Sequence, residues 1–298
     1  MIKKYLFCFL FLSLNCFGQS LIPNPPQLTA TSYLLLDAKT LKIISENNAE
    51  QSTGLASITK IMTAYVVADQ IQKGYLSGSS LVKISEKCWR MEGSRMFIKE
   101  GTEVSVSDLM LGIIVQSGND ASCALAEHIA GSEYDFAELM NDYARQMNLE
   151  ETNFMNPTGL PDVNHYSTAE DIAKLSIKLI QDFPETYKIF SQKEFTYNEI
   201  RQLNRNSLLW QDDSIDGIKT GHTSTSGYCM VSSAKRGDMR LIAVTLNSSS
   251  EKSRLRDSRR LLDYGFRYYT TKKIISKYEP ITSVDVWAGN EDSLELGP

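Results

Sequence analysis

The chain has 298 residues, of which 42% are hydrophobic and 22% are charged, a composition typical of a globular protein with one or two domains. Its formal net charge of −5 becomes −7 without residues 1–18, because two of the 31 basic residues leave and all 36 acidic ones remain. An acidic protein is a poor candidate for binding nucleic acid or anionic lipid, so we expect neither as a partner.

Residues 1–18 have the features of a secretory signal peptide. Two lysines open the segment, an almost wholly apolar run follows from Tyr5 to Leu14, and Cys16-Phe17-Gly18 is a small-x-small end. The apolar run is too short to span a bilayer. We therefore expect export, with cleavage after Gly18. Lipidation of Cys16 is the less favoured alternative, because Asn15 is large for the site before such a cysteine.

The next part of the chain predicts a strand hairpin followed by a helix. Residues 31–48 contain two β-rich runs around a turn from Asp37 to Thr40. A helical spacing then relates five apolar residues: Ile58, Ile61, Met62, Tyr65 and Val66. Residues 80–104 form a shorter polar and β-rich stretch.

The middle of the chain has a helical pattern. Residues 107–147 predict three helical segments, and Asp120 is the expected N-cap of the second. Residues 156–162, Asn-Pro-Thr-Gly-Leu-Pro-Asp, predict a loop. Residues 167–180 open with a capping pattern and predict an amphipathic helix.

The last third returns to strands. Residues 227–247 predict two strands joined by a turn at Arg236-Gly237-Asp238, and residues 251–269 predict a helix. Strands from both ends around a helical middle indicate an α+β fold with an antiparallel sheet. From about Thr271 the chain has short β-like pieces, too few to form a domain alone.

Cysteine and histidine give little sign of disulfide or metal chemistry. Outside the signal the cysteines are Cys88, Cys123 and Cys229. They are far apart and odd in number, so we expect three small buried side chains, with one bridge as the alternative in an oxidising compartment. The histidines are His128, His165 and His222. None has a metal-ligand spacing, and we expect neither a metal nor a cofactor.

Ser57 and Lys60 are candidates for a nucleophile and its base. Ser-x-x-Lys occurs four times, beginning at Ser57, Ser80, Ser232 and Ser249. Two of these lie in strand-like sequence, where positions i and i+3 face opposite sides, and one lies in a polar turn. Only Ser57 begins an apolar-periodic helix, where i and i+3 are neighbours and the N-terminal amides favour negative charge. Taken alone, an ordinary helix start with a solvated lysine remains the alternative.

Two further motifs favour the catalytic interpretation. Ser117-x-Asn119 lies between two predicted helices, and Lys219-Thr220-Gly221, which occurs once, leads into a predicted strand. The three motifs begin 60 and then 102 residues apart. Their order, Ser-x-x-Lys, Ser-x-Asn and Lys-Thr-Gly, is that of penicillin-binding proteins and class A β-lactamases.

From about residue 23 to residue 269 the chain resembles a low-molecular-mass penicillin-binding protein of the penicillin-binding protein 5/6 type, a serine-type D-alanyl-D-alanine carboxypeptidase of peptidase family S11. The stretches that carry this are LASITKIMTAYVV, GSRMFIKEG, LMLGIIVQSGNDAS, NPTGLPD, HYSTAEDIAKL, RQLNRNSLLW, DGIKTGHT and GDMRLIAV. The resemblance implies a transpeptidase fold shared with β-lactamases, in which helices flank an antiparallel five-stranded sheet and form an all-helical subdomain. It divides the chain into a signal peptide at 1–18, a catalytic domain at 24–270 and the beginning of a β-rich second domain at 271–298.

The resemblance also implies a place and a substrate. The protein would act in the periplasm on the peptides of peptidoglycan, and β-lactam antibiotics would inhibit it covalently. The C-terminal amphipathic anchor helix usual in the family is missing from this sequence, so attachment to the membrane surface would need a segment that the sequence lacks.

Chemistry assigns the roles at the bond that is cut. A serine hydroxyl needs a base to attack an amide, and Lys60, one helical turn from Ser57, can serve if it is neutral. Burial and a second cation, Lys219, are expected to lower the pKa of Lys60. Ser117 would relay the proton to the leaving D-alanine nitrogen. Asn119 would bond both Lys60 and the substrate backbone.

Other residues would hold the substrate. Gly221 would let the substrate backbone lie close against the strand. The backbone amides of Ser57 and His222 would form the oxyanion hole. The terminal carboxylate needs a cation, and a guanidinium can bind it through two hydrogen bonds. Its expected partners are Lys219, Thr220 and an arginine, for which the resemblance points to Arg254 first and Arg205 second.

Four functions share these motifs. The favoured one is a D,D-carboxypeptidase, which removes the terminal D-alanine from stem pentapeptides through an acyl-Ser57 intermediate. A D,D-endopeptidase would use the same residues. A class A β-lactamase would need a Glu-x-x-x-Asn run, and none occurs in the 35 residues after Asn119. A catalytically silent wall-binding or β-lactam-sensing protein is the non-enzymatic alternative.

Overall fold

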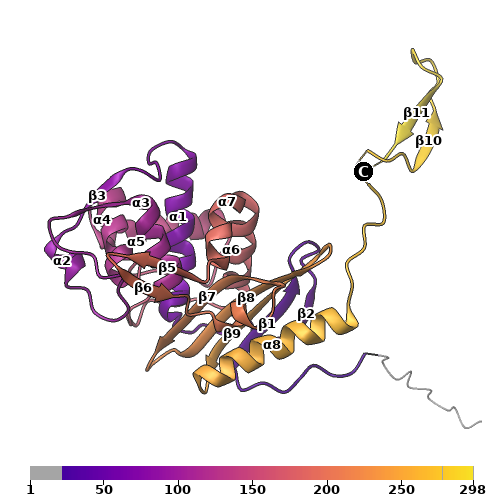
Figure 1. Ribbon diagram of the computed structural model, residues 1–298. Coiled ribbons are helices and arrows are strands. Elements are labelled where there is room, and N and C mark those ends of the chain that lie inside the picture. The colour runs from indigo at the N-terminus through magenta and orange to yellow at the C-terminus, as the bar shows by residue number, and fades with distance from the viewer. Residues whose placement is uncertain (1–21, 277, 298) are drawn as a thin grey trace, which may run out of the picture.

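A five-stranded antiparallel sheet organises the chain (Figure 1). The computed structural model describes residues 22–276 and 278–297, so the expected signal peptide and Cys16 lie outside the described residues. The strands follow the spatial order β2-β1-β9-β8-β7. Their bounds are Ser32–Asp37 for β1, Ile43–Asn47 for β2, Ile215–Thr223 for β7, Gly227–Arg236 for β8 and Met239–Ser248 for β9. The strand β7 lies at one edge of the sheet.

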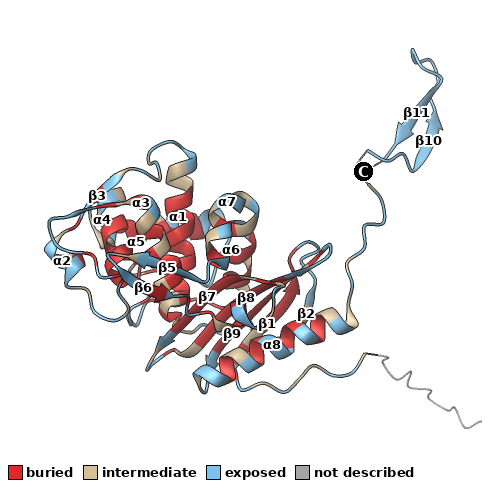
Figure 2. Ribbon diagram, viewed as in Figure 1, coloured by how far each residue is buried: buried red, intermediate tan, exposed pale blue. Residues whose placement is uncertain are grey.

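Side chains alternate across this sheet and build a core on each face. Leu34 and Leu36 of β1 belong to the larger core, which the helical part of the chain covers. Leu35 points the other way, into a core shared with α8 (Glu251–Tyr268). The sheet therefore lies between α8 on one face and the remaining helices on the other, as Figure 1 shows. The buried faces stand out in Figure 2 along the central strands and α1.

The helical part gathers above one face of the sheet. Its longer helices are α1 (Lys60–Gln72), α3 (Val106–Leu111), α4 (Asn119–Ala130), α5 (Glu133–Gln146) and α6 (Ala169–Asp182). Shorter turns complete it: η1 (Ala56–Thr59), α2 (Glu86–Trp89), the π-helical η2 (Gly112–Gln116), α7 (Pro184–Tyr187) and η3 (Lys188–Ser191). The turn η4 (Ser207–Trp210) instead packs in the core shared with α8, through Leu208 and Leu209. Two small hairpins join them, β3 (Leu81–Lys83) with β4 (Glu103–Ser105) and β5 (Glu194–Tyr197) with β6 (Ile200–Leu203).

The structure confirms the α+β class, the five-stranded sheet and the expected N-cap of α6, where the Thr168 hydroxyl accepts from the Asp171 amide at 3.1 Å. The expected N-cap of α4 is wrong. Gly118 occupies the N-cap position, and the Asp120 carboxylate instead accepts from the amides of Met96 and Phe97 at 3.0 and 2.9 Å. The polar stretch of residues 80–104 also contains the short helix α2.

The strands β10 (Thr282–Asp285) and β11 (Ser293–Leu296) pair with each other and stand away from the main sheet in Figure 1. Every residue of the two strands is exposed, as Figure 2 shows in pale blue. That residues 271–298 begin a second domain stays a prediction. Among the helices of the described residues, none has the length and apolar character needed to cross a membrane.

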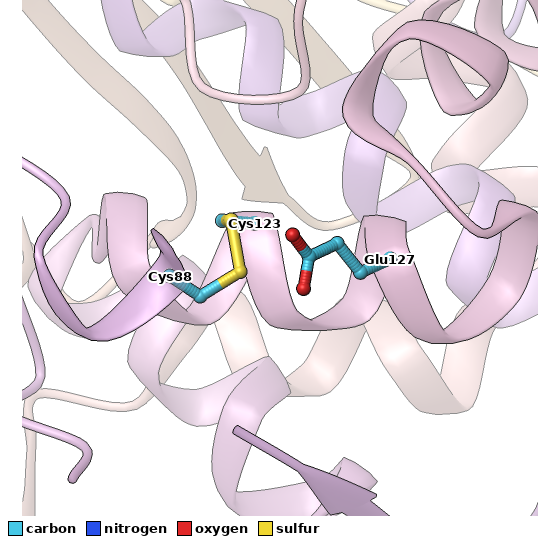
Figure 3. A group of neighbouring side chains, drawn as sticks. All are labelled: Cys88, Cys123 and Glu127. Carbon is cyan, nitrogen blue, oxygen red and sulfur yellow. A yellow bond between two sulfur atoms is a disulfide. The ribbon is translucent and has the colours of Figure 1, made fainter. Parts of the chain in front are cut away.

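A disulfide joins Cys88 of α2 to Cys123 of α4, which corrects the expectation of three unpaired cysteines (Figure 3). The two Cα atoms lie 5.3 Å apart, and Cys229 stays a buried free thiol. The pairing could not be predicted from the sequence, because the two cysteines are 35 residues apart and meet only where the chain folds back between the two helices. Glu127 lies beside the two sulfurs, but disulfide sulfurs are not thiolates, so the group offers no metal-ligand set in this state.

We expect the disulfide to stabilise the protein by about 2–4 kcal/mol, because it restricts the unfolded chain over a loop of this size. Urea unfolding with and without a thiol reductant measures this. The double variant Cys88→Ser/Cys123→Ser should match the reduced protein and gain nothing from oxidation, whereas Cys229→Ala should keep the full reductant effect. An unfolding midpoint that ignores reductant in the unaltered protein would contradict the bridge.

Candidate active site

Ser57 lies on the short turn η1, directly before α1. The turn begins at Ala56, whose φ of +48° is uncommon for a residue with a side chain. Two glycines make room for it. A Cβ on Gly159, which has a φ of +83°, would clash with the Ala56 carbonyl oxygen. A Cβ on Gly221 would come within 2.9 Å of the Leu55 carbonyl oxygen and 3.1 Å of the Ser57 nitrogen.

Lys60 is fully buried, and its Nζ has three oxygen neighbours. Nζ lies 3.0 Å from Ser57 Oγ, 2.8 Å from Asn119 Oδ1 and 2.6 Å from the Thr158 carbonyl oxygen. The last two atoms can only accept. A neutral amine has two hydrogens and one lone pair, so donation to these two acceptors leaves the lone pair facing the hydroxyl of Ser57.

Burial lowers the pKa of Lys60 to about 7, while the carboxylate of Asp120 acts in the opposite direction. At neutral pH a large fraction of this lysine is therefore the free amine. Of the two causes expected from the sequence, burial lowers the pKa of Lys60, and repulsion by Lys219 is not among the causes. The charge repulsion is felt at Lys219, whose pKa burial lowers first and the charges of Lys60, Arg205 and Arg254 lower further.

Ser117 and Asn119 face the two lysines from the far side. The π-helical turn η2 ends at Ser117, whose φ of +67° turns the chain sharply into α4. Its hydroxyl accepts from Lys219 Nζ at 2.8 Å. The Asn119 amide group bridges two elements, because Oδ1 accepts from Lys60 and Nδ2 donates to the Glu92 carbonyl oxygen at 2.6 Å. Both side chains are buried.

The strand β7 carries the third motif past the nucleophile. Lys219 and Thr220 are buried, and Lys219 also donates to the Thr220 carbonyl oxygen at 3.2 Å. The structure gives a reason for Gly221 other than the expected one: its missing side chain makes room for the turn that carries Ser57. This close approach brings the Ser57 amide beside Gly221 of β7. The His222 ring itself stacks on Tyr228, with centroids 4.0 Å apart.

The two candidate arginines differ in accessibility. Arg254 is 5% exposed, and it donates to the Gly221 carbonyl oxygen at 3.0 Å and to Glu251 at 3.1 Å. Its Nε has no hydrogen-bond partner among the residues that the structure describes. Arg205 is exposed and lines a pocket of about 430 Å³ with Gln116 and Glu251. Arg254 is held against β7, whereas the exposed Arg205 lines a pocket whose lining does not include Ser57, Lys60 or Lys219.

Three contributors were missed from the sequence. Thr158, in the loop expected from Asn-Pro-Thr-Gly, supplies its carbonyl oxygen to Lys60. Asp120 accepts hydrogen bonds from the backbone amides of residues 96–98, and its charge raises the pKa of Lys60. His165 is 4% exposed and contacts Thr59 Oγ1 at 2.7 Å. In the sequence, the one indication of these roles was position: Asp120 follows Asn119 of the Ser-x-Asn motif, and Thr158 lies in the Asn-Pro-Thr-Gly stretch.

Taken together, the site offers a hydroxyl beside a buried amine of low pKa, a second buried lysine that donates to another serine, and a glycine-lined strand edge. A hydroxyl nucleophile, a neutral amine base and a hydroxyl proton donor are the groups that acyl transfer needs. Among the described residues the site contains no cluster of metal-binding side chains.

Comparison with known proteins gives a consistent result. A family model described as D-alanyl-D-alanine carboxypeptidase, peptidase S11, matches residues 19–250. The D-alanyl-D-alanine carboxypeptidase DacA of Haemophilus influenzae is 44% identical over 279 residues, which cover 92% of this chain and 71% of that protein.

Solved structures agree with the family match. Penicillin-binding protein 5 of Haemophilus influenzae superposes with a TM-score of 0.88 at 44% identity, over 92% of this chain and 81% of that one. Penicillin-binding protein D2 of Listeria monocytogenes, in its ampicillin-bound form, superposes with a TM-score of 0.75 at 29% identity, over 82% of this chain and all of that one.

We expect His165 to make the protein sensitive to acid. Burial lowers its pKa from the ordinary 6.5 to about 4. Between these values the unfolded chain binds a proton that the folded protein does not, so stability falls as pH falls from 6.5 to 4. The full loss is about 3 kcal/mol. Urea unfolding across this range should show a shallower pH dependence in His165→Gln, and equal slopes would refute the assignment.

Proposed function

The chain belongs to the peptidase S11 family of serine-type D-alanyl-D-alanine carboxypeptidases, and we propose that it cuts the terminal D-alanine from peptidoglycan stem pentapeptides with Ser57 as its nucleophile. The observation that carries the residue assignment is the buried Lys60 amine, whose two other neighbours are acceptors and which lies 3.0 Å from Ser57 Oγ.

In the acylation step, Ser57 Oγ attacks the carbonyl carbon between the last two D-alanines while its proton passes to Lys60 Nζ. The negative charge that forms on the carbonyl oxygen is held by the backbone amides of Ser57 and His222. Each such donor contributes roughly 3–4 kcal/mol to lowering the barrier in hydrolases. The proximity of Gly221 to the Ser57 nitrogen supports this pair of amides.

Collapse of the tetrahedral intermediate breaks the bond to the leaving nitrogen, which must take up a proton. Ser117 supplies it: its hydroxyl donates a proton to the leaving nitrogen, and the proton that Lys60 took from Ser57 then passes to Ser117, directly or through Lys219, whose Nζ lies 2.8 Å from Ser117 Oγ. Free D-alanine departs, and Lys60 is again neutral. Asn119 keeps Lys60 oriented throughout. Its proposed contact with the substrate is with the backbone of the peptide.

Water completes the cycle. It loses a proton to neutral Lys60 and attacks the ester carbonyl carbon. The bond to Ser57 Oγ breaks, and that oxygen recovers the proton from Lys60. The shortened peptide leaves with a new carboxylate. No metal or cofactor takes part in this proposal.

The terminal carboxylate is recognised by Lys219, Thr220 and an arginine. Its negative charge would favour the protonated form of Lys219, whose pKa is lowered without a ligand. Arg205 is the better candidate of the two arginines for direct contact, because its side chain is exposed and its charge acts on Lys219. Arg254 acts through β7, whose Gly221 carbonyl it holds.

We further propose that β-lactam antibiotics acylate Ser57, as the ampicillin-bound form of a related penicillin-binding protein suggests. The same sites exist in β-lactamases and D,D-endopeptidases, but the family match and the named relatives favour the carboxypeptidase. A long-lived penicilloyl-enzyme separates this function from a β-lactamase. Release of D-alanine separates it from a silent binding protein.

Location and domain organisation complete the proposal. Residues 1–18 direct export to the periplasm, where peptidoglycan peptides are accessible. Residues 24–270 form the catalytic domain, which includes the sheet and all residues assigned above. Residues 271–298 begin a β-rich unit, consistent with the separate pairing of β10 and β11.

The Ser57→Ala variant should fold normally and release no D-alanine from a peptide that ends in D-Ala-D-Ala. Release is measured with a D-amino-acid oxidase assay, and covalent labelling with a fluorescent penicillin should disappear in parallel. Ser80→Ala is the matched control, because Ser80 also precedes a lysine by three residues, yet its hydroxyl bonds Ser77. Labelling that persists in Ser57→Ala would overturn the assignment.

The pH dependence of kcat/KM should report Lys60. The rate should fall tenfold per pH unit below about 7, because the protonated amine cannot accept the Ser57 proton. Asp120→Asn should move this midpoint to lower pH, since the Asp120 charge raises the pKa of Lys60. Asp182→Asn, which alters a carboxylate bonded to Tyr65, should leave it in place. An unmoved midpoint in Asp120→Asn would contradict the electrostatic assignment.

A further inference from the structure

A buried chain of hydrogen bonds ends on the carbonyl oxygen next to the nucleophile. The Met155 backbone amide lies 3.2 Å from His165 Nδ1. His165 Nε2 lies 2.7 Å from Thr59 Oγ1. The Thr59 hydroxyl in turn donates to the Ala56 carbonyl oxygen at 2.8 Å. Neither His165 nor Thr59 is one of the residues that the three motifs specify, although Thr59 lies between Ser57 and Lys60 in the chain.

The chemistry of the partners fixes the direction of this chain. A backbone amide can only donate, so His165 Nδ1 is the acceptor and carries no proton. A neutral ring then holds its proton on Nε2, which donates to Thr59. The single hydroxyl hydrogen of Thr59 is left for Ala56. Burial keeps the ring neutral, since His165 is 4% exposed and its pKa lies at about 4.

The carbonyl at the end of the chain belongs to a particular peptide unit. The Ala56 C=O and the Ser57 N–H are the two ends of one planar amide. Fixing the oxygen therefore fixes the direction of the N–H. A hydrogen bond received by the oxygen also polarises the amide and makes its N–H a stronger donor. That N–H is one of the two proposed oxyanion donors.

We propose that His165 and Thr59 are positioning residues that orient and polarise the Ser57 amide for the oxyanion. The proposal rests on the proposed function, because it needs the Ser57 amide to bind developing charge. Neither residue is assigned a contact with substrate or a proton transfer. Their effect belongs to the tetrahedral states, in which the oxyanion exists, and not to the bound substrate.

The local backbone explains why such support is needed. Ala56 has a φ of +48°, which a residue with a side chain adopts only when its surroundings hold it there. Gly159, which has no side chain, leaves room for the same carbonyl oxygen on another side. The Thr59 hydroxyl is therefore a specific restraint on this oxygen, and its loss would let the peptide plane rotate.

Two matched pairs of variants test this. Thr59→Val removes the hydroxyl at nearly constant shape, and Thr59→Ser restores it. His165→Leu removes the ring N–H, and His165→Gln keeps a neutral N–H donor. We measure kcat and KM for D-alanine release, the rate constant of acylation by penicillin, and inhibition by a peptide boronic acid that mimics the tetrahedral state.

Thr59→Val and His165→Leu should lower kcat and the acylation rate by about 10–100-fold, less than the loss of an entire oxyanion donor. The boronic acid should bind more weakly by a similar factor, while KM changes less than about threefold. Thr59→Ser and His165→Gln should recover most of the loss. Thermal unfolding of each variant identifies those that do not fold. If one pair contains such a variant, the kinetics of the other pair test the proposal.

Three outcomes would overturn the proposal: normal kcat in Thr59→Val or His165→Leu, equal defects in both members of a pair, or loss confined to KM. Failure of the proposed function looks different. In that case the unaltered protein would release no D-alanine, or Ser57→Ala would still be labelled by penicillin. An active protein that needs Ser57 but tolerates Thr59→Val and His165→Leu would refute only the positioning role.

Discussion

The site depends on the burial of one amine. Lys60 is enclosed among oxygen atoms that can accept its two hydrogens, and the low polarity around it disfavours the ammonium form. What remains is a lone pair directed at Ser57 Oγ, 3.0 Å away. The proposed mechanism thereby obtains its base at neutral pH from a side chain that is normally a cation. The surrounding elements act on the reaction chiefly by keeping that amine buried and oriented.

Three distant parts of the chain close over the amine. The loop after α5 gives the Thr158 carbonyl, the turn into α4 gives Asn119, and the edge strand β7 brings Lys219 against Ser117. Two of these contacts require sharp backbone turns, at Ser117 and at Gly159. The sheet supplies rigidity, because β7 pairs with β8 on one side and packs against the turns η1 and η3. Precision at the nucleophile is thus a property of long-range packing.

Much of this was predictable, because some determinants are local. Strand alternation predicted the hairpin of β8 and β9, and helical spacing predicted that Ser57 and Lys60 are neighbours. That Lys219 lies across the site was expected only from the family resemblance that the three motifs carry. Determinants that depend on tertiary contact were not predictable. The Cys88–Cys123 bridge and the role of Asp120 arise because the chain near residue 92 folds back onto α4. The reason for Gly221 was misjudged, since only coordinates reveal what a missing Cβ would strike.

The most direct measurement is the titration of the Lys60 side chain itself. Nuclear magnetic resonance of ¹³C- and ¹⁵N-labelled lysine, with the Lys60→Arg variant to assign the signal, follows the amine without relying on turnover. A midpoint near 7 for Lys60 would support a base that is largely neutral before substrate arrives. A midpoint above 9, close to that of an ordinary solvated lysine, would mean that the amine is protonated at neutral pH and cannot be the base described here.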